Sequence, residues 1–313
     1  MAAARAWVLG VGLLGGLTGL ALAVGPQGFG WGADGALVML RAPRVLAALA
    51  AGLALGIGGA TQQGVFRNPL ADPGLTGVFG GALFGIALLL GLFPEAAWQR
   101  AWFIPGAAFA GALGASALLA LIGGGGSSAR LLLTGLGLNA FTAAGTLVIA
   151  SRSGESRELL TNGAYGDWLG MATLELIWLP GLLCLVSTAL LLVLARPLDL
   201  LAFGEDAARG FGCDVGPARR RAVLLTALAA AAATCLIGQV AFIGLLASHL
   251  ARALVGPRHA QVLPLSALLG AGLLLGADTM GRGLWSQAPL SAAAVTALLG
   301  APLFIWIARG RHE

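Results

Sequence analysis

The chain has 313 residues, of which 58% are hydrophobic and 10% are charged, against about 25% charged in an ordinary soluble domain. So few polar side chains cannot cover a soluble fold, and the composition also excludes a disordered chain and a disulfide scaffold. The formal net charge of +5 comes from scattered arginines and does not indicate a nucleic-acid partner, so the sequence predicts a helical integral membrane protein.

A helix needs about 20 mostly apolar residues to cross the hydrocarbon core. We expect ten spans, near 6–25, 43–63, 73–92, 102–122, 131–150, 174–195, 222–240, 242–256, 263–281 and 290–308. The uncharged run 222–248 is too long for one span, and we expect it to break at Gly238-Gln239. The whole chain, 1–313, is expected to form one all-α transmembrane domain.

The arginines predict the orientation of these spans. With the N-terminus in the cytoplasm, twelve of the 18 arginines fall on the cytoplasmic side and six on the far side. The triplet Arg219-Arg220-Arg221, just before the seventh span, contributes most to this bias. The positive-inside rule therefore places both termini in the cytoplasm.

Small residues at helical spacing predict close helix packing in lipid. The candidate pairs are Gly12/Gly16, Gly15/Gly19, Gly52/Gly56 and the ladder Gly77/Gly81/Gly85.

Polar residues interrupt the apolar pattern between the second and third spans, from Arg67 to Gly74. Asp72 is expected to cap the third span, with Pro73 at its first position. Capping does not account for Asn68 and Leu70 in the same segment.

A second polar segment, Arg196–Arg221, is expected in the cytoplasm. Glu205 and Asp206 suit the first turn of a short helix and Gly212 suits its end, while Pro217 could open a second short helix that runs into the seventh span. A solvated loop is the alternative, but two short helices would make a compact knob suited to docking a partner.

The remaining polar residues lie in or beside the spans. On the far side, Arg41, Arg44 and Arg282 could contact lipid headgroups. Within the spans, Asn139 and Thr142 could line a path, whereas interhelical hydrogen bonds are the better interpretation of Asp278 and His249.

The sequence excludes several kinds of catalysis. It contains no lysine, so it cannot form a Walker A loop or a Schiff base. No carboxylate pair, Ser/His/Asp set or His/Cys cluster lies at catalytic or metal-ligand spacing, which makes an intramembrane enzyme a weak hypothesis. Energy from ATP would have to come from a partner chain.

Several motifs together resemble the FecCD-type permease family, the membrane subunits of importers for iron–siderophores, haem and vitamin B12. They cover nearly the whole chain in order: residues 41–46, 58–63, 68–74, 130–135, 204–212, 242–252 and 295–302. The resemblance implies a type II ABC importer permease fold with about ten transmembrane helices. It implies a homodimer or pseudo-dimer in the bacterial inner membrane, two cytoplasmic ATPase subunits and a periplasmic binding protein. The partner ATPase would use ATP and Mg, and this chain is expected to bind no cofactor and no metal of its own.

The resemblance also suggests roles for single residues. The segment 196–221 would couple to the ATPase, with the contact made by Gly204, Glu205, Ala208, Arg209 and Gly212. Asn68 and Leu70 would form a cytoplasmic gate with Ser127 and Ser128, and Asn139 and Thr142 would line the pathway. Arg41, Arg44 and Arg282 would seat the binding protein, because guanidinium groups give bidentate contacts to carboxylates.

The expected function is therefore transport of a metal chelate, most simply an iron–siderophore, by a subunit that is not itself an enzyme. Haem or cobalamin is the alternative cargo. A stand-alone secondary transporter is the alternative class, for which Asp278 is the one good ion-coupling candidate.

Overall fold

The computed structural model describes residues 2–25, 28–31, 35–93, 102–123, 128–152, 168–284 and 290–309. Ten main helices coincide with the ten predicted spans: α1 (Ala2–Ala23), α2 (Ala36–Phe66), α3 (Val78–Leu92), α5 (Phe103–Gly123), α6 (Ser128–Ala150), α8 (Leu174–Leu192), α11 (Val215–Ile237), α12 (Ile243–Val255), α13 (His259–Leu284) and α14 (Ala292–Arg309). Among the described residues, six of them, α1, α2, α6, α8, α11 and α13, are long and apolar enough to cross a membrane. The other four contain shorter apolar segments. With 13 residues, α12 extends only about 20 Å.

Short elements connect these helices. The chain turns through an antiparallel pair, β1 (Val24–Gly25) and β2 (Gly28–Phe29), which the sequence did not predict. Two 3₁₀ turns, η2 (Pro73–Thr76) and η3 (Trp168–Met171), precede α3 and α8. Two short helices, α9 (Ala195–Ala202) and α10 (Glu205–Gly210), precede α11.

Two predicted helix ends can be compared with the structure. The break at Gly238 is confirmed, because α11 ends at Ile237 and α12 begins at Ile243. The capping role of Asp72 was assigned to the wrong helix. Its carboxylate accepts a 2.8 Å hydrogen bond from the backbone N–H of Gly74 and so caps η2, while α3 begins only at Val78.

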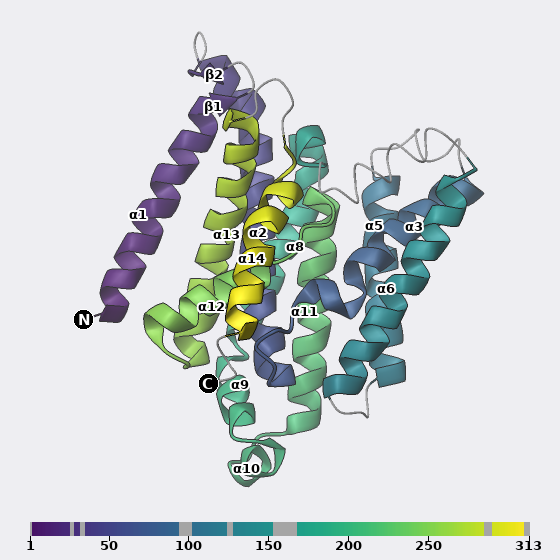
Figure 1. Ribbon diagram of the computed structural model, residues 1–313, viewed down its shortest axis with the longest axis vertical. Helices are drawn as coiled ribbons and strands as arrows, with labels where there is room; N and C mark the ends of the chain where they lie inside the picture. The colour runs from purple at the N-terminus through teal and green to yellow at the C-terminus, as the bar shows by residue number, and fades with distance from the viewer. Residues whose placement is uncertain are drawn as a thin grey trace.

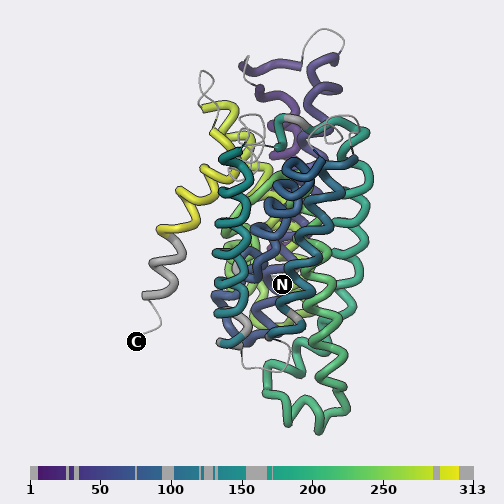
Figure 2. Tube along the Cα trace, turned by 90° about the vertical axis from the view of Figure 1, so that its right-hand side faces the viewer, coloured from purple at the N-terminus to yellow at the C-terminus, as the bar shows by residue number. Residues whose placement is uncertain are grey.

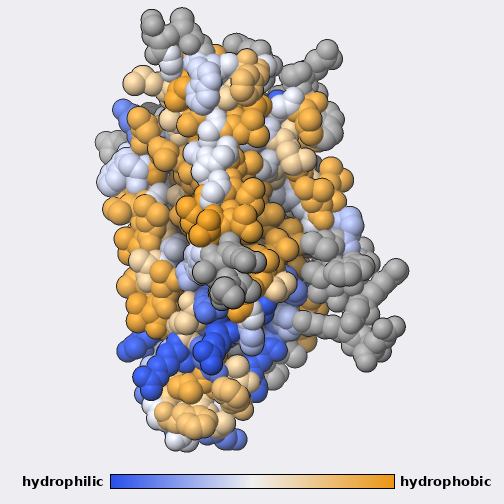
Figure 3. Space-filling view, turned by 90° about the vertical axis from the view of Figure 1, so that its left-hand side faces the viewer, coloured by the Kyte–Doolittle hydropathy of each residue, from blue (hydrophilic) through white to orange (hydrophobic). Residues whose placement is uncertain are grey.

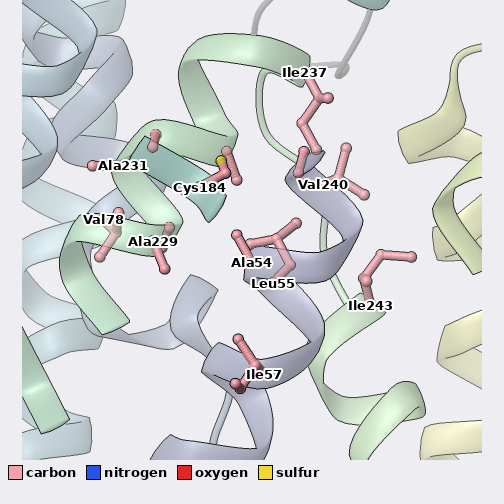
Figure 4. Packing of buried hydrophobic residues seen from close by; sticks show 14 of the residues in the cluster. Ala54, Leu55, Ile57, Val78, Cys184, Ala229, Ala231, Ile237, Val240 and Ile243 are labelled. Carbon is pink, nitrogen blue, oxygen red and sulfur yellow. The ribbon is translucent and has the colours of Figure 1, made fainter. Parts of the chain in front are cut away.

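The long helix α2 lies at the centre of the bundle. It packs against α13, α11, α8 and α12, while α3, α5 and α6 form a second group beside it (Figure 1). The core fills the space where α2 meets α8, α11 and α12, and Figure 4 shows Leu55, Ile57, Cys184 and Ile237 there. The start of α1 and the end of α14 both point toward the end of the bundle that carries α9 and α10 (Figure 1).

The glycine pairs behave differently from one another. At Gly52, an added Cβ would lie 2.6 Å from the backbone of Ala271, so this glycine lets α2 and α13 touch. Gly81 and Gly85 likewise lie against Gly111 of α5. In α1, by contrast, none of the described residues places an atom within 4 Å of a Cβ added at Gly12, Gly15, Gly16 or Gly19, so the predicted close packing is not found there within this part of the chain.

Apolar residues cover most of the face shown in Figure 3, and hydrophilic residues form a band between this apolar belt and the tip. The tip consists of α9 and α10, which Figure 2 shows projecting beyond the other helices. We call this end of the bundle the knob end. Exposed arginines near it are Arg67, Arg130, Arg196, Arg209, Arg220, Arg221 and Arg258.

Candidate functional site

The α9–α10 knob, Ala195–Gly212, is a compact pair of short helices. The sequence predicted α10 but not α9, and it placed the second short helix after Pro217 instead. Ala208 is fully buried, and its carbonyl accepts a hydrogen bond from the N–H of Cys213. Gly204 and Gly212 both have positive φ, 105° and 77°, a conformation that glycine adopts without steric cost. Pro217 lies in the first turn of α11, which continues as the seventh span without a separate short helix.

Ion pairs hold α10 in place. Arg219 Nη2 of α11 lies 2.5 Å from Glu205 Oε1, and Arg209 contacts both Glu205 and Asp206 within its own helix. The hydrogen bond from Arg219 and the charge of its guanidinium hold the pKa of Glu205 below its ordinary value. The predicted residues Glu205 and Arg209 therefore belong to one network that fixes α10 to α11.

Two aromatic side chains of the knob were missed by sequence reasoning. Phe203 is 75% exposed and Phe211 is 67% exposed, although both are large and apolar. They flank α10 on either side. A groove of about 480 Å³ opens between α9 and α11, lined by Leu200, Phe211 and Arg221 among others. The sequence pattern that could have identified Phe203 and Phe211 is a phenylalanine on each side of a short charged helix.

At the opposite end of the bundle, the arginines bind groups of this chain. Arg44 donates to both carboxylate oxygens of Asp278 at 2.6–3.2 Å, and Arg282 donates to Oδ2 of the same carboxylate at 3.0 Å. Asp278 is fully buried and Arg282 is 2% exposed. Interhelical bonding of Asp278 is thus confirmed, and the pair joins α2 to α13.

Arg41 and Arg282 bind backbone carbonyls at the end of α1 and just beyond it. Arg41 Nη1 donates to the carbonyls of Leu22, Ala23 and Gly30 at 2.7–2.9 Å, and Arg282 Nη1 donates to Val24 at 2.9 Å. Positive groups are favourable at the carbonyl end of a helix. Of the three arginines predicted to seat a partner, Arg282 is buried, while the side chain of Arg44 is 22% exposed.

Asn139 and Thr142 share one face of α6, as predicted, and that face packs against the same chain. Asn139 Nδ2 donates to the carbonyl of Gly74 at 2.9 Å, and the Thr142 hydroxyl donates to Leu138 within its own helix at 2.8 Å. Thr142 is 4% exposed. Gly80 of α3 makes room for both, since an added Cβ there would lie 2.9 Å from Asn139 Oδ1. In this structure the two residues join α6 to η2 and α3.

The predicted gate residues are only partly described. Asn68 Oδ1 accepts a 2.9 Å hydrogen bond from the N–H of Leu70, which shapes the turn after α2. Both side chains are half-buried. Ser128 begins α6, and Ser127 lies outside the described residues.

A family model matches most of the chain. Residues 30–310 match the model of the FecCD transport family. The ferric enterobactin transport system permease protein of Escherichia coli is 39% identical over 275 residues, covering 86% of this chain and 80% of that protein. The hemin transport system permease protein of Yersinia pestis is 37% identical over 281 residues, covering 88% and 83%.

A relative with a different named cargo and a solved structure are also similar to this chain. The cobalamin import system permease protein of Halobacterium salinarum is 35% identical over 277 residues, covering 87% of this chain and 73% of that protein. A solved metal-chelate type ABC transporter in an inward-facing conformation superimposes with a TM-score of 0.88 at 27% identity, covering 98% of this chain and 99% of that chain.

Proposed function

Because this chain belongs to the FecCD transport family, it is the membrane permease subunit of an ABC importer, and we propose that its cargo is an iron–siderophore complex. ATP is hydrolysed by a separate ATPase subunit. We propose that the permease lies in the inner membrane, pairs with a second copy or a close relative, and binds two ATPase subunits and one binding protein.

The α9–α10 knob is the observation that carries this proposal. It projects from the bundle next to exposed arginines, presents Phe203 and Phe211, and is held by the Glu205–Arg219 pair. Buried aromatic anchors dominate the energetics of many protein interfaces. The knob is accordingly the proposed ATPase-docking surface. We further propose that the arginine-rich knob end is the cytoplasmic side and that both termini lie in the cytoplasm.

The opposite end is then the proposed seat of the binding protein. Arg41, Arg44 and Arg282 together with Asp278 leave a net positive cluster there, which suits acidic side chains on a partner. Arg44 is the partly exposed member that ion-pairs with Asp278. Arg44→Glu should therefore weaken binding-protein affinity, and an acidic-to-basic change on the binding protein should partly restore it. Unchanged affinity at low salt would contradict this seat.

The contacts of Asp278 favour an ABC importer over a secondary transporter. An ion-coupling carboxylate must bind and release a cation during transport. Here, two arginines already engage Asp278 through three nitrogen atoms.

Cargo identity can be tested by uptake. A strain that lacks the gene should be supplied with labelled iron–siderophores, haem and cobalamin, with and without the gene restored. We expect restored uptake of a ferric siderophore. Restored uptake of haem or cobalamin alone would replace the proposed cargo, and uptake that survives without a functional partner ATPase would contradict the ABC importer.

A further inference from the structure

We propose that Asp199 and His259 are positioning residues for transport, an inference that rests on the proposed ATPase-docking role of the knob. Their contact fixes the α9–α10 knob to α13, so that movement of the knob reaches the opposite end of the bundle through that helix.

One carboxylate oxygen makes this contact. Asp199 Oδ1, on α9, accepts a 2.8 Å hydrogen bond from the backbone N–H of His259 and lies 2.8 Å from Nδ1 of the same residue. His259 is the first residue of α13, so the carboxylate of one helix satisfies a free N–H at the start of another. A negative charge at that position is also favourable for the dipole of α13.

The imidazole is enclosed on its other side. His259 is 5% exposed, and its Nε2 is buried with no hydrogen-bond partner among the residues that the structure describes. An added Cβ at Gly64 would lie 2.7 Å from this Nε2, so the ring fits only because the last turn of α2 has no side chain there. The ring therefore joins three helices, α9, α13 and α2, and its Nδ1 is aimed at Asp199.

From this contact, α13 extends for 26 residues to the arginine cluster at the other end. It touches α2 closely at Gly52, where no Cβ separates the backbones. Near its last turn, Asp278 binds Arg44 of α2 and Arg282 binds the carbonyl of Val24. The helix is thus fixed by polar contacts at both ends, to the knob at one and to α1 and α2 at the other.

The test measures how far the binding protein stimulates the ATPase in the assembled complex. The permease, its ATPase and its loaded binding protein would be reconstituted in nanodiscs, and stimulated and basal ATP hydrolysis compared. Asp199→Ala should lower the stimulation ratio on the order of tenfold, the scale of typical coupling energies. Asp199→Asn, which keeps an oxygen acceptor for both His259 groups, should restore most of it.

Two further variants separate positioning from stability. Gly64→Ala should lower the ratio as Asp199→Ala does, because its methyl group displaces the imidazole without touching either partner's charge. Asp214→Ala is the matched control, since Asp214 is an exposed aspartate near the knob that makes no side-chain cap on α11. It should keep the wild-type ratio.

Three results would overturn the inference: a wild-type ratio in Asp199→Ala, a loss in Asp199→Asn as large as in Asp199→Ala, or an Asp199→Ala permease that no longer co-purifies with the ATPase. The last would mean that Asp199 builds the docking surface itself. The wild-type complex reports separately on the proposed function, because a permease that binds no ATPase would contradict that function before any variant is compared.

Discussion

Arg44 and Asp278 form an ion pair across the interface of α2 and α13, with Arg44 Nη2 2.6 Å from Asp278 Oδ1 and the carboxylate fully buried. Arg282 shares the same carboxylate from one turn further along α13. A buried charge is tolerated when it is paired and hydrogen-bonded. The three side chains therefore form one ion-pair cluster that joins α2 to α13 at the end of the bundle opposite the knob.

Removal of the shared carboxylate should destabilise the fold. Asp278→Ala leaves two guanidinium groups without their counter-ion, and breaking a buried pair in this way costs about 3–5 kcal/mol. The midpoint of thermal unfolding in detergent should fall clearly for Asp278→Ala and less for Asp278→Asn, which keeps an acceptor oxygen. An unchanged midpoint in Asp278→Ala would show that the cluster contributes little.

The sequence predicted the helices far better than their contacts. Lipid has no water to satisfy the backbone, so long apolar runs must become helices, and ten stretches did so in the predicted places. Which side chain meets which depends on the tertiary arrangement. Arg44 and Asp278 are 234 positions apart, and nothing in either local segment identifies the other.

The exposed aromatics of the knob should contribute to ATPase binding. Phe203→Ala and Phe211→Ala should each weaken co-purification of the ATPase by at least about fivefold, because truncation of an anchor typically costs more than 1 kcal/mol. Phe29→Ala is the control, since Phe29 is equally exposed, at 75%, but lies at the opposite end in β2. Thermal stability should be unchanged in all three variants. Equal ATPase binding by all three would exclude the aromatics from the docking surface.

Thr142 should become accessible only when α6 separates from α3. On a background lacking Cys184, Cys213 and Cys235, Thr142→Cys should resist a water-soluble thiol reagent without nucleotide, because the position is buried beside Gly80. It should react when the complete importer hydrolyses ATP, if it lines the pathway. Ser151→Cys, at an exposed position, should react in every state. Protection of Thr142→Cys throughout the cycle would leave it a purely packing role.

The Glu205–Arg219 pair predicts a dependence on pH. The pKa of Glu205 is lowered in the folded chain, chiefly by the hydrogen bond from Arg219, so its contribution to stability is present above the ordinary glutamate pKa. That contribution is lost as the pH falls through the lowered pKa. Backbone amides of α10 should therefore exchange hydrogen faster in acid, after correction for intrinsic rates.

Glu205→Gln should show the faster exchange already at neutral pH. Asp206→Asn is the matched control, because Asp206 has a fully exposed side chain and, among the described residues, forms an ion pair only within α10. If Glu205→Gln exchanges like the wild-type chain at neutral pH, the pair does not hold the knob.

The knob shows which part of a candidate site a sequence can reveal. Glu205 and Asp206 at the start of a short helix and Gly212 after its end follow local rules, and these predictions agree with the positions in the structure. Asp199 and His259 follow no local rule. Their contact depends on α9 folding back beneath α13, and on the space that Gly64 leaves in a third helix.

ATP-driven uptake into proteoliposomes tests the central claim most directly. The permease would be reconstituted with its ATPase inside and its binding protein, loaded with a radioactive ferric siderophore, outside. We predict accumulation of the label that requires ATP, the binding protein and the permease together. Uptake that proceeds without ATP hydrolysis, or is driven by an ion gradient alone, would contradict the assignment of this chain as an ABC importer permease.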